Sequence, residues 1–136
     1  MGGVWRHVAQ TALLPYRISL LNSTALLAIA QLGEGTSQRE LAEAIGVDTA
    51  IVARIINELT ASGLVQRRVG DFDQRVRTLW FTEVGRLLPQ EIDAALRKAR
   101  AQILAQVDDR DLETALRVFH LMERAVWSVP GCVVVY

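Results

Sequence analysis

Residues 37–85 constrain the fold of this chain more than any other stretch. Ser37 and Glu40 have the spacing of a capping box, in which a hydroxyl and a carboxylate each accept from a backbone amide at a helix start. The apolar pattern that follows predicts a helix over residues 38–45. This helix ends at Gly46, because glycine takes the left-handed conformation that closes helices most easily.

A second helix is predicted directly after this glycine. Asp48 is its N-cap, and Val47 and Val52 stand at the positions of a hydrophobic staple around that cap. Two helices joined by so short a turn cross steeply, which is the helix-turn-helix arrangement. The core stripe of the second helix has the spacing i, i+3, i+4 and i+7 and consists of Val52, Ile55, Ile56 and Leu59.

The opposite face of the second helix carries small and polar side chains. Arg54 and Asn57 have the hydrogen-bonding groups that read guanine and adenine edges, and small side chains let a helix approach a surface closely. A solvated face of an ordinary amphipathic helix explains the same pattern equally well. The outward residues are Thr49, Ala50, Ala53, Arg54 and Asn57.

A β-hairpin rich in arginine follows this helix. Residues 65–69 and 75–81 are rich in β-branched and aromatic residues, with a Gly-Asp turn signal between them. The whole chain has 15 basic and 15 acidic residues, so its net charge gives no support for nucleic-acid binding. Residues 54–77, however, contain five arginines and three acids, a local excess of two positive charges. The hairpin charges are Arg67, Arg68, Arg75 and Arg77 against Asp71 and Asp73.

The flanking segments are predicted to be mostly helical. Helices are expected at residues 4–13, 18–32, 83–107 and 110–127, with Thr82 capping the third and Asp108 or Asp109 capping the fourth. Pro89 should kink the third helix or delay its start. The hydrophobic share of 51% exceeds what a small monomer needs, which favours a partner subunit. The predicted fold is α+β and mostly helical, a single domain over residues 1–136 with a DNA-binding lobe at about 36–82.

Three motifs give the chain a family resemblance. They are Ser37 to Ala42 (SQRELA), Gly63 to Arg67 (GLVQR), and the hairpin from Asp71 to Arg75 (DFDQR) with its exit LWFTEVG ending at Gly85. In this order and spacing the chain resembles the MarR family of bacterial winged-helix transcriptional regulators. The resemblance implies a homodimer held by helices at 4–13, 83–107 and 110–127. The single cysteine favours a reducing cytoplasm, and the lack of a Cys/His cluster argues against the common zinc sites; no cofactor is expected.

The same resemblance implies how DNA is bound and how binding is controlled. It places Arg54 on a recognition helix in the major groove and Arg75 on a wing in the minor groove, with Asp73 orienting Arg75. Family members often act as repressors that small aromatic acids or cysteine oxidation release from DNA. With the outward residues of the second helix, the hairpin arginines and the start of the first helix, the predicted DNA-contacting set is Gln38, Arg39, Thr49, Ala50, Ala53, Arg54, Asn57, Arg67, Arg68, Asp73, Arg75 and Arg77.

An effector site is predicted where the dimer helices meet the DNA-binding lobe. Trp5, Tyr16 and Arg17 lie beside the apolar helix 18–32, and an arginine near aromatic rings suits an aromatic carboxylate. Core packing explains the aromatic residues equally well. His7 and His120 are candidates for the same pocket, although lone helical histidines are more often packing or surface residues.

Other functional classes have less support in the sequence. Cys132 is the one cysteine, so no intrachain disulfide forms, and without a basic neighbour an inert thiol is favoured over a redox switch. No nucleophile with a base, no spaced acid pair and no phosphate loop argues for catalysis. Two rivals remain: a winged-helix interaction module without specific DNA binding, which an alanine-rich recognition helix fits, and the dimerisation domain of an enzyme.

Overall fold

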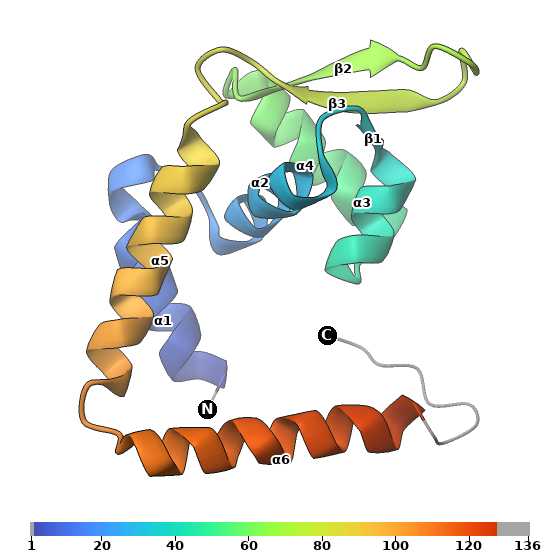
Figure 1. Cartoon of the computed structure of the whole chain (residues 1–136). Helices are drawn as coiled ribbons and strands as arrows, with labels where there is room; N and C mark the ends of the chain where they lie inside the picture. The colour runs from blue at the N-terminus through green and yellow to red at the C-terminus, as the bar shows by residue number, and fades with distance from the viewer. Residues whose placement is uncertain (1, 128–136) are drawn as a thin grey trace. The chain divides into compact units, whose positions relative to one another are not determined.

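The computed structural model describes residues 2–127, and its fold is α+β and mostly helical, as predicted (Figure 1). Contacts divide the chain into two compact units, residues 1–99 and 100–136, which are described separately below. One domain over residues 1–136 stays a prediction. In chain order the elements are α1 (Gly2–Leu13), the 3-10 helix η1 (Leu14–Tyr16), α2 (Leu20–Leu32), β1 (Thr36–Ser37), α3 (Gln38–Ile45), α4 (Thr49–Ala61), β2 (Val65–Val69), β3 (Arg77–Phe81), α5 (Leu88–Leu104) and α6 (Asp109–Trp127).

The core of the first unit is organised around α2. This helix packs against α1, α3 and α4, and Leu26 and Ile29 are fully buried on it. The Ser19 hydroxyl caps α2 by accepting from the Asn22 amide at 3.1 Å. The buried Ser23 hydroxyl donates to the Leu20 carbonyl at 2.7 Å, so the polar group inside the core is satisfied. Residues 20–29 of α2 are buried or half-buried except for Thr24, which agrees with the apolar pattern of this segment, whereas residues 30–32 are exposed.

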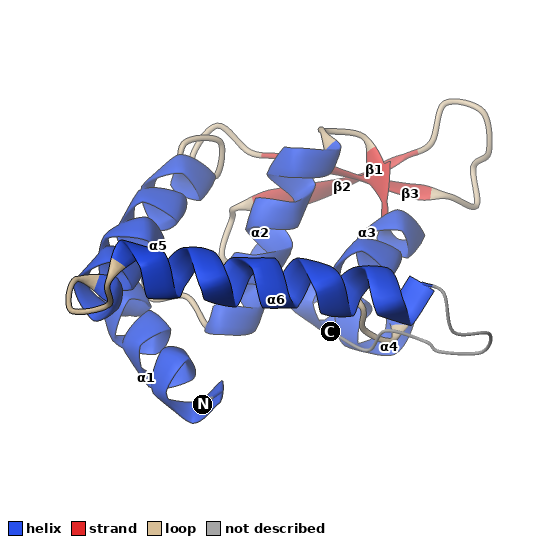
Figure 2. Cartoon of the chain, turned by 60° about the horizontal axis from the view of Figure 1, so that its bottom comes forward, coloured by secondary structure: helices blue, strands red, loops and turns tan. Residues whose placement is uncertain are grey.

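The three strands form one antiparallel sheet in the order β1-β3-β2. Figure 2 shows the strands gathered together beside α3, which contacts both β1 and β3. The register pairs Val65 with Phe81 in the hairpin and Thr36 with Leu79 at the other edge. Strand β1 has only two residues, so no alternating pattern in the sequence predicted it.

The caps predicted for the helix-turn-helix are confirmed. Ser37 Oγ accepts from the Glu40 amide at 3.1 Å, and Glu40 Oε2 accepts from the Ser37 amide at 2.7 Å. Hydrogen bonds to the carboxylate, first from the Ser37 backbone amide and then from the Ser37 and Thr36 hydroxyls, lower the pKa of the Glu40 carboxyl below its usual value. Gly46 is left-handed at φ 68°, and Asp48 Oδ1 accepts from the Ala50 amide at 2.7 Å.

Two predicted boundaries are wrong. The second hairpin strand begins at Arg77 rather than at residue 75, because residues 70–76 form a loop closed by a bond from the Gly70 amide to the Val76 carbonyl. The helix expected at residue 83 begins at Leu88. Pro89 therefore lies in the first turn, where its missing N–H has no helical partner in any case. Its expected delay of the helix is confirmed.

The prediction that Thr82 caps α5 is wrong. Its hydroxyl donates to the Gly63 carbonyl at 2.6 Å and accepts from the Gly85 amide at 3.0 Å. The Thr82 amide donates to the Leu64 carbonyl at 3.1 Å. These bonds fasten the exit of β3 to the end of α4, and they use the hydroxyl that a helix cap would need.

In the second unit, α6 is amphipathic and begins at a predicted cap. Asp108 Oδ1 accepts from the Arg110 amide at 2.8 Å, which selects Asp108 over Asp109. Several large apolar side chains of this helix are exposed in the single chain, namely Leu116, Val118, Phe119, Leu121 and Met122. Within residues 2–127 no single helix has the length and apolarity to cross a membrane; helices 3–16 and 20–32 meet those criteria only jointly, across a bend of 76°.

Candidate nucleic-acid interface

The candidate interface is built on α4, whose inner face holds it in the core. Val52, Ile55, Ile56 and Leu59 are all buried, as the stripe predicted. Thr49, Ala50, Arg54 and Asn57 are consequently exposed, whereas Ala53 is half-buried. A helix held by one face in this way presents the other to solvent, which is the arrangement that a recognition helix needs.

Arg54 projects from the exposed face of α4. Its side chain is 67% exposed, and its Nη1 lies 3.9 Å from Glu58 Oε1. Glu58 Oε2 also accepts from Asn22 Nδ2 of α2 at 2.8 Å. An ion pair this long and this exposed is weak, so the Arg54 guanidinium can exchange Glu58 for another acceptor at low cost.

Arg67 of β2 has a different environment from the other arginines. It is half-buried, and its Nε donates to Gln38 Oε1 at 2.7 Å. Its Nη2 donates to Asn57 Oδ1 at 2.8 Å and to the Ala53 carbonyl at 3.3 Å. One guanidinium thus joins β2 to the first residue of α3 and to the middle of α4.

The loop between β2 and β3, the wing, orients Arg75 outward. Asp73 Oδ1 accepts from the Arg75 backbone amide at 2.9 Å and from its Nε at 3.3 Å. The Arg75 side chain is 92% exposed. The contact expected between these two residues is therefore present, and the far end of the guanidinium remains accessible.

The remaining hairpin arginines are partly engaged. Arg77 Nη1 donates to the Gln74 carbonyl at 2.6 Å, which braces the wing. The Arg68 guanidinium lies 4.5 Å from the centre of the Trp80 ring, within cation–π range. Both side chains belong to exposed residues, so these contacts position the charges without removing them from solvent.

A surface hollow brings the start of α3 and the wing together. It is lined by Ser37, Gln38 and Arg39 on one side and by Arg75, Val76 and Arg77 on the other. The arginines of this hollow, Arg39, Arg75 and Arg77, attract an anion such as a phosphate, whereas at the helix start the Glu40 carboxylate already accepts from the Ser37 amide. Glu43, whose Oε1 is 3.1 Å from Arg39 Nε, offsets part of this charge. Gln38, which lines this hollow, is bonded to Arg67, and Arg67 is bonded to Asn57 on α4. The start of α3, the wing and α4 therefore form one surface.

Phe72 is a wing residue that the sequence analysis did not single out. It is fully exposed and lines a second hollow, on the wing, together with Arg68 and Trp80. A large apolar side chain between two aspartates in a hairpin turn was the available signal, because turns usually carry small or polar residues.

The predicted effector residues lie on neighbouring elements of the first unit. Trp5 on α1 and Tyr16 in η1 are half-buried and pack against the core. Arg17, directly after η1, is exposed and left-handed at φ 51°. An effector site at these residues stays a prediction.

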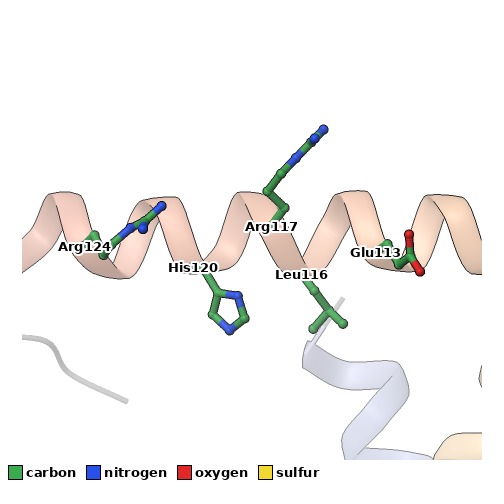
Figure 3. A pocket seen from close by; sticks show the side chains of 5 residues that line it. All are labelled: Glu113, Leu116, Arg117, His120 and Arg124. Carbon is green, nitrogen blue, oxygen red and sulfur yellow. The ribbon is translucent and has the colours of Figure 1, made fainter.

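The two histidines are both exposed in the single chain. His7 lies on α1, and His120 lies on α6 in a shallow depression along that helix (Figure 3). Leu116 and His120 point to the same side of α6, and Arg117 points to the other side. Cys132 is outside the described residues. Within residues 2–127, no group of three or more His, Cys, Asp or Glu side chains is placed to hold a metal ion.

Comparison with known proteins shows a family match over part of the chain and a structural likeness over most of it. Residues 18–76 match the model of the MarR family. A MarR-family transcriptional regulator from Rhodococcus sp. RHA1 is 24% identical, over 89% of this chain and 85% of that one, with a TM-score of 0.76. CouR from Rhodococcus jostii RHA1, bound to p-coumaroyl-CoA, is 22% identical over 98% and 89%, with a TM-score of 0.74. A MarR mutant from E. coli complexed with operator DNA is 16% identical over 92% and 87%, with a TM-score of 0.80. At these identities the structural likeness shows a shared fold.

Proposed function

We propose that this chain is a transcriptional regulator of the MarR family that binds specific DNA sequences, since residues 18–76 match the model of that family. The observation that carries the proposal is the single surface formed by the exposed face of α4, the start of α3 and the wing. Gln38, Arg39, Arg75 and Arg77 line one hollow on it. The structural likeness to a MarR protein complexed with operator DNA supports the same function. In this mode α4 enters the major groove and Arg75 reaches the minor groove.

We propose that the regulator works as a homodimer. Apolar side chains are exposed on α1 and along the two C-terminal helices when the chain is taken alone, among them Val4, Leu116, Phe119 and Met122. Exposed apolar surface on this scale is more often an interface than a solvated surface. We therefore expect a dimer at micromolar concentration by light scattering. A monomer under those conditions would contradict the dimer and weaken the DNA model, since a single lobe makes half of the contacts.

We further propose that the protein acts as a repressor and that a small aromatic acid releases it from DNA. The family resemblance and the p-coumaroyl-CoA bound to a structural relative support this control. The predicted site is Trp5, Tyr16 and Arg17. We expect an aromatic acid to release the wild-type protein from DNA. The Arg17→Ala variant should stay bound to DNA when the same acid is added.

Arg54 is the residue expected to read a base. We predict that Arg54→Ala weakens binding to the specific site by about 1 to 3 kcal/mol and binding to random DNA much less, because a base-edge contact exists only on the correct sequence. Fluorescence titration against both DNAs measures the difference.

Arg97→Ala is the matched control for this substitution. Arg97 is also exposed on a helix and paired with an acid one turn away, at 2.7 Å from Asp93 Oδ2. Arg97 lies on α5, outside the proposed DNA-binding surface. Its loss should therefore leave the preference for the specific DNA site unchanged. Equal losses on specific and random DNA for Arg54→Ala would reassign Arg54 to a phosphate contact.

A further inference from the structure

Gln38 and Asn57 are amide side chains on two different helices, and both are held by Arg67. We propose that Arg67 is a positioning residue that fixes both side chains as hydrogen-bond donors toward DNA. This inference rests on the proposed function, since it concerns how the same surface reads a sequence. It also removes Arg67 from the predicted DNA-contacting set and makes it a residue that positions Gln38 and Asn57.

The two carboxamide groups can face Arg67 in only one way. A carboxamide has an oxygen that accepts and a nitrogen that donates. Arg67 can only donate, so it takes Asn57 Oδ1 at 2.8 Å and Gln38 Oε1 at 2.7 Å. The reversed orientation would set N–H groups against a cation. Hydrogen bonds from a charged donor are also stronger than neutral ones, which holds each oxygen on the arginine side.

The amide nitrogens are left to act outside the protein. Within residues 2–127, Asn57 Nδ2 and Gln38 Nε2 donate no hydrogen bond to another group. Asn57 is exposed while Arg67 is half-buried. Arg67 itself is fixed by the Ala53 carbonyl at 3.3 Å and by its place in β2. For Asn57 the bound oxygen therefore faces Arg67, and the donating nitrogen is left to face solvent where DNA would lie; Gln38 is half-buried.

This orientation changes the base that Asn57 is expected to read. Bidentate recognition of adenine needs the oxygen to accept from the adenine amino group while the nitrogen donates to N7. With the oxygen turned toward Arg67, only the donor is presented. Asn57 then loses its bidentate preference for adenine. It favours guanine, which presents the two acceptors N7 and O6, or thymine with O4, over adenine, whose N7 acceptor lies beside an amino group, and it disfavours the amino group of cytosine.

An isosteric substitution separates donor from acceptor at this position. Asn57→Asp keeps an oxygen for Arg67 and replaces the outward N–H₂ with a second acceptor. We expect its binding to the wild-type site to weaken on the order of tenfold or more, and the bases selected from a randomised DNA pool to shift toward cytosine at one position in each half-site. Asn57→Ala should lose the preference at that position without acquiring a new one.

Arg67→Met tests the positioning role directly. It removes the donors but keeps an apolar stem of similar length, so the Asn57 carboxamide becomes free to rotate. Adenine should then become more frequent among the selected bases at the same position than it is with the wild type, a change that mere loss of stability would not cause. Thermal midpoints identify any variant that fails to fold, and Gln38→Glu repeats the donor-to-acceptor exchange on α3 as an independent variant.

The outcomes distinguish this inference from the proposed function. If the wild type selects a sequence but prefers adenine over guanine and thymine at the position that Asn57→Asp alters, the positioning role is wrong and the DNA-binding function stands. The same conclusion follows if Asn57→Asp and Gln38→Glu both select as the wild type does. If the wild type selects no sequence at all, the proposed function fails and the positioning role fails with it.

Discussion

Gly85→Ala should destabilise the fold by at least about 3 kcal/mol, because the new methyl group would overlap a backbone that cannot move aside. Gly85 is buried at the exit of β3. A Cβ there would overlap the Leu64 carbonyl oxygen and lie 2.8 Å from its carbon and 2.9 Å from its Cα. The same carbonyl accepts from the Thr82 amide at 3.1 Å. Chemical denaturation followed by circular dichroism measures the loss.

Gly3→Ala is the matched control for this change. Gly3 lies in α1, and nothing stands within 4 Å of the position that an added methyl group would take. Alanine has the higher helix propensity, so this variant should be as stable as the wild type or slightly more stable. If Gly85→Ala also stays within about 1 kcal/mol of the wild type, the close approach between the β3 exit and the end of α4 is wrong.

Arg75→Ala should weaken DNA binding roughly tenfold or more while leaving the thermal midpoint nearly unchanged. The side chain is 92% exposed and contributes little to folding, whereas a narrow minor groove concentrates negative potential that attracts an extended cation. The slope of log affinity against log salt should become shallower by about one unit for each arginine removed, so about two for a dimer. An unchanged slope would show that Arg75 makes no phosphate or groove contact.

Asp73 tests the sign of the effect that the wing has on DNA binding. Asp73→Ala should also weaken binding, although it removes a negative charge from a DNA-facing loop, because Asp73 Oδ1 holds both the backbone and the Nε of Arg75. Asp71→Ala is the control: Asp71 is exposed in the same loop, and its loss should leave affinity unchanged or raise it. If Asp73→Ala tightens binding as a simple loss of repulsion would, the orienting pair is wrong.

Local signals allowed the helix-turn-helix to be predicted from the sequence. The capping box at Ser37, the closing Gly46 and the Asp48 cap each act over fewer than five residues, and the inward stripe of α4 follows from helical periodicity alone. The Asp73–Arg75 contact is also local, since the two residues are separated by one position in a tight loop.

Long-range contacts account for what the sequence did not reveal. The pairing of β1 with β3 joins residues more than forty positions apart. Strand β1 has only two residues, which is too short for an alternating pattern in the sequence. Thr82 has the sequence context of a helix cap, but its hydroxyl is bonded to Gly63 instead. Arg67 resembled the other hairpin arginines, because no spacing in the sequence shows that Gln38 and Asn57 converge on it.

Sequence-specific DNA binding is tested most directly by titrating the wild-type protein against DNA from upstream of its own gene and against random DNA at two salt concentrations. We predict tighter binding to the upstream DNA at both salts, and affinities for both DNAs that fall as salt rises, because phosphate contacts contribute to each complex. Equal affinity for the two DNAs, or no binding to either, would contradict a sequence-specific regulator and favour a winged helix used for protein contacts.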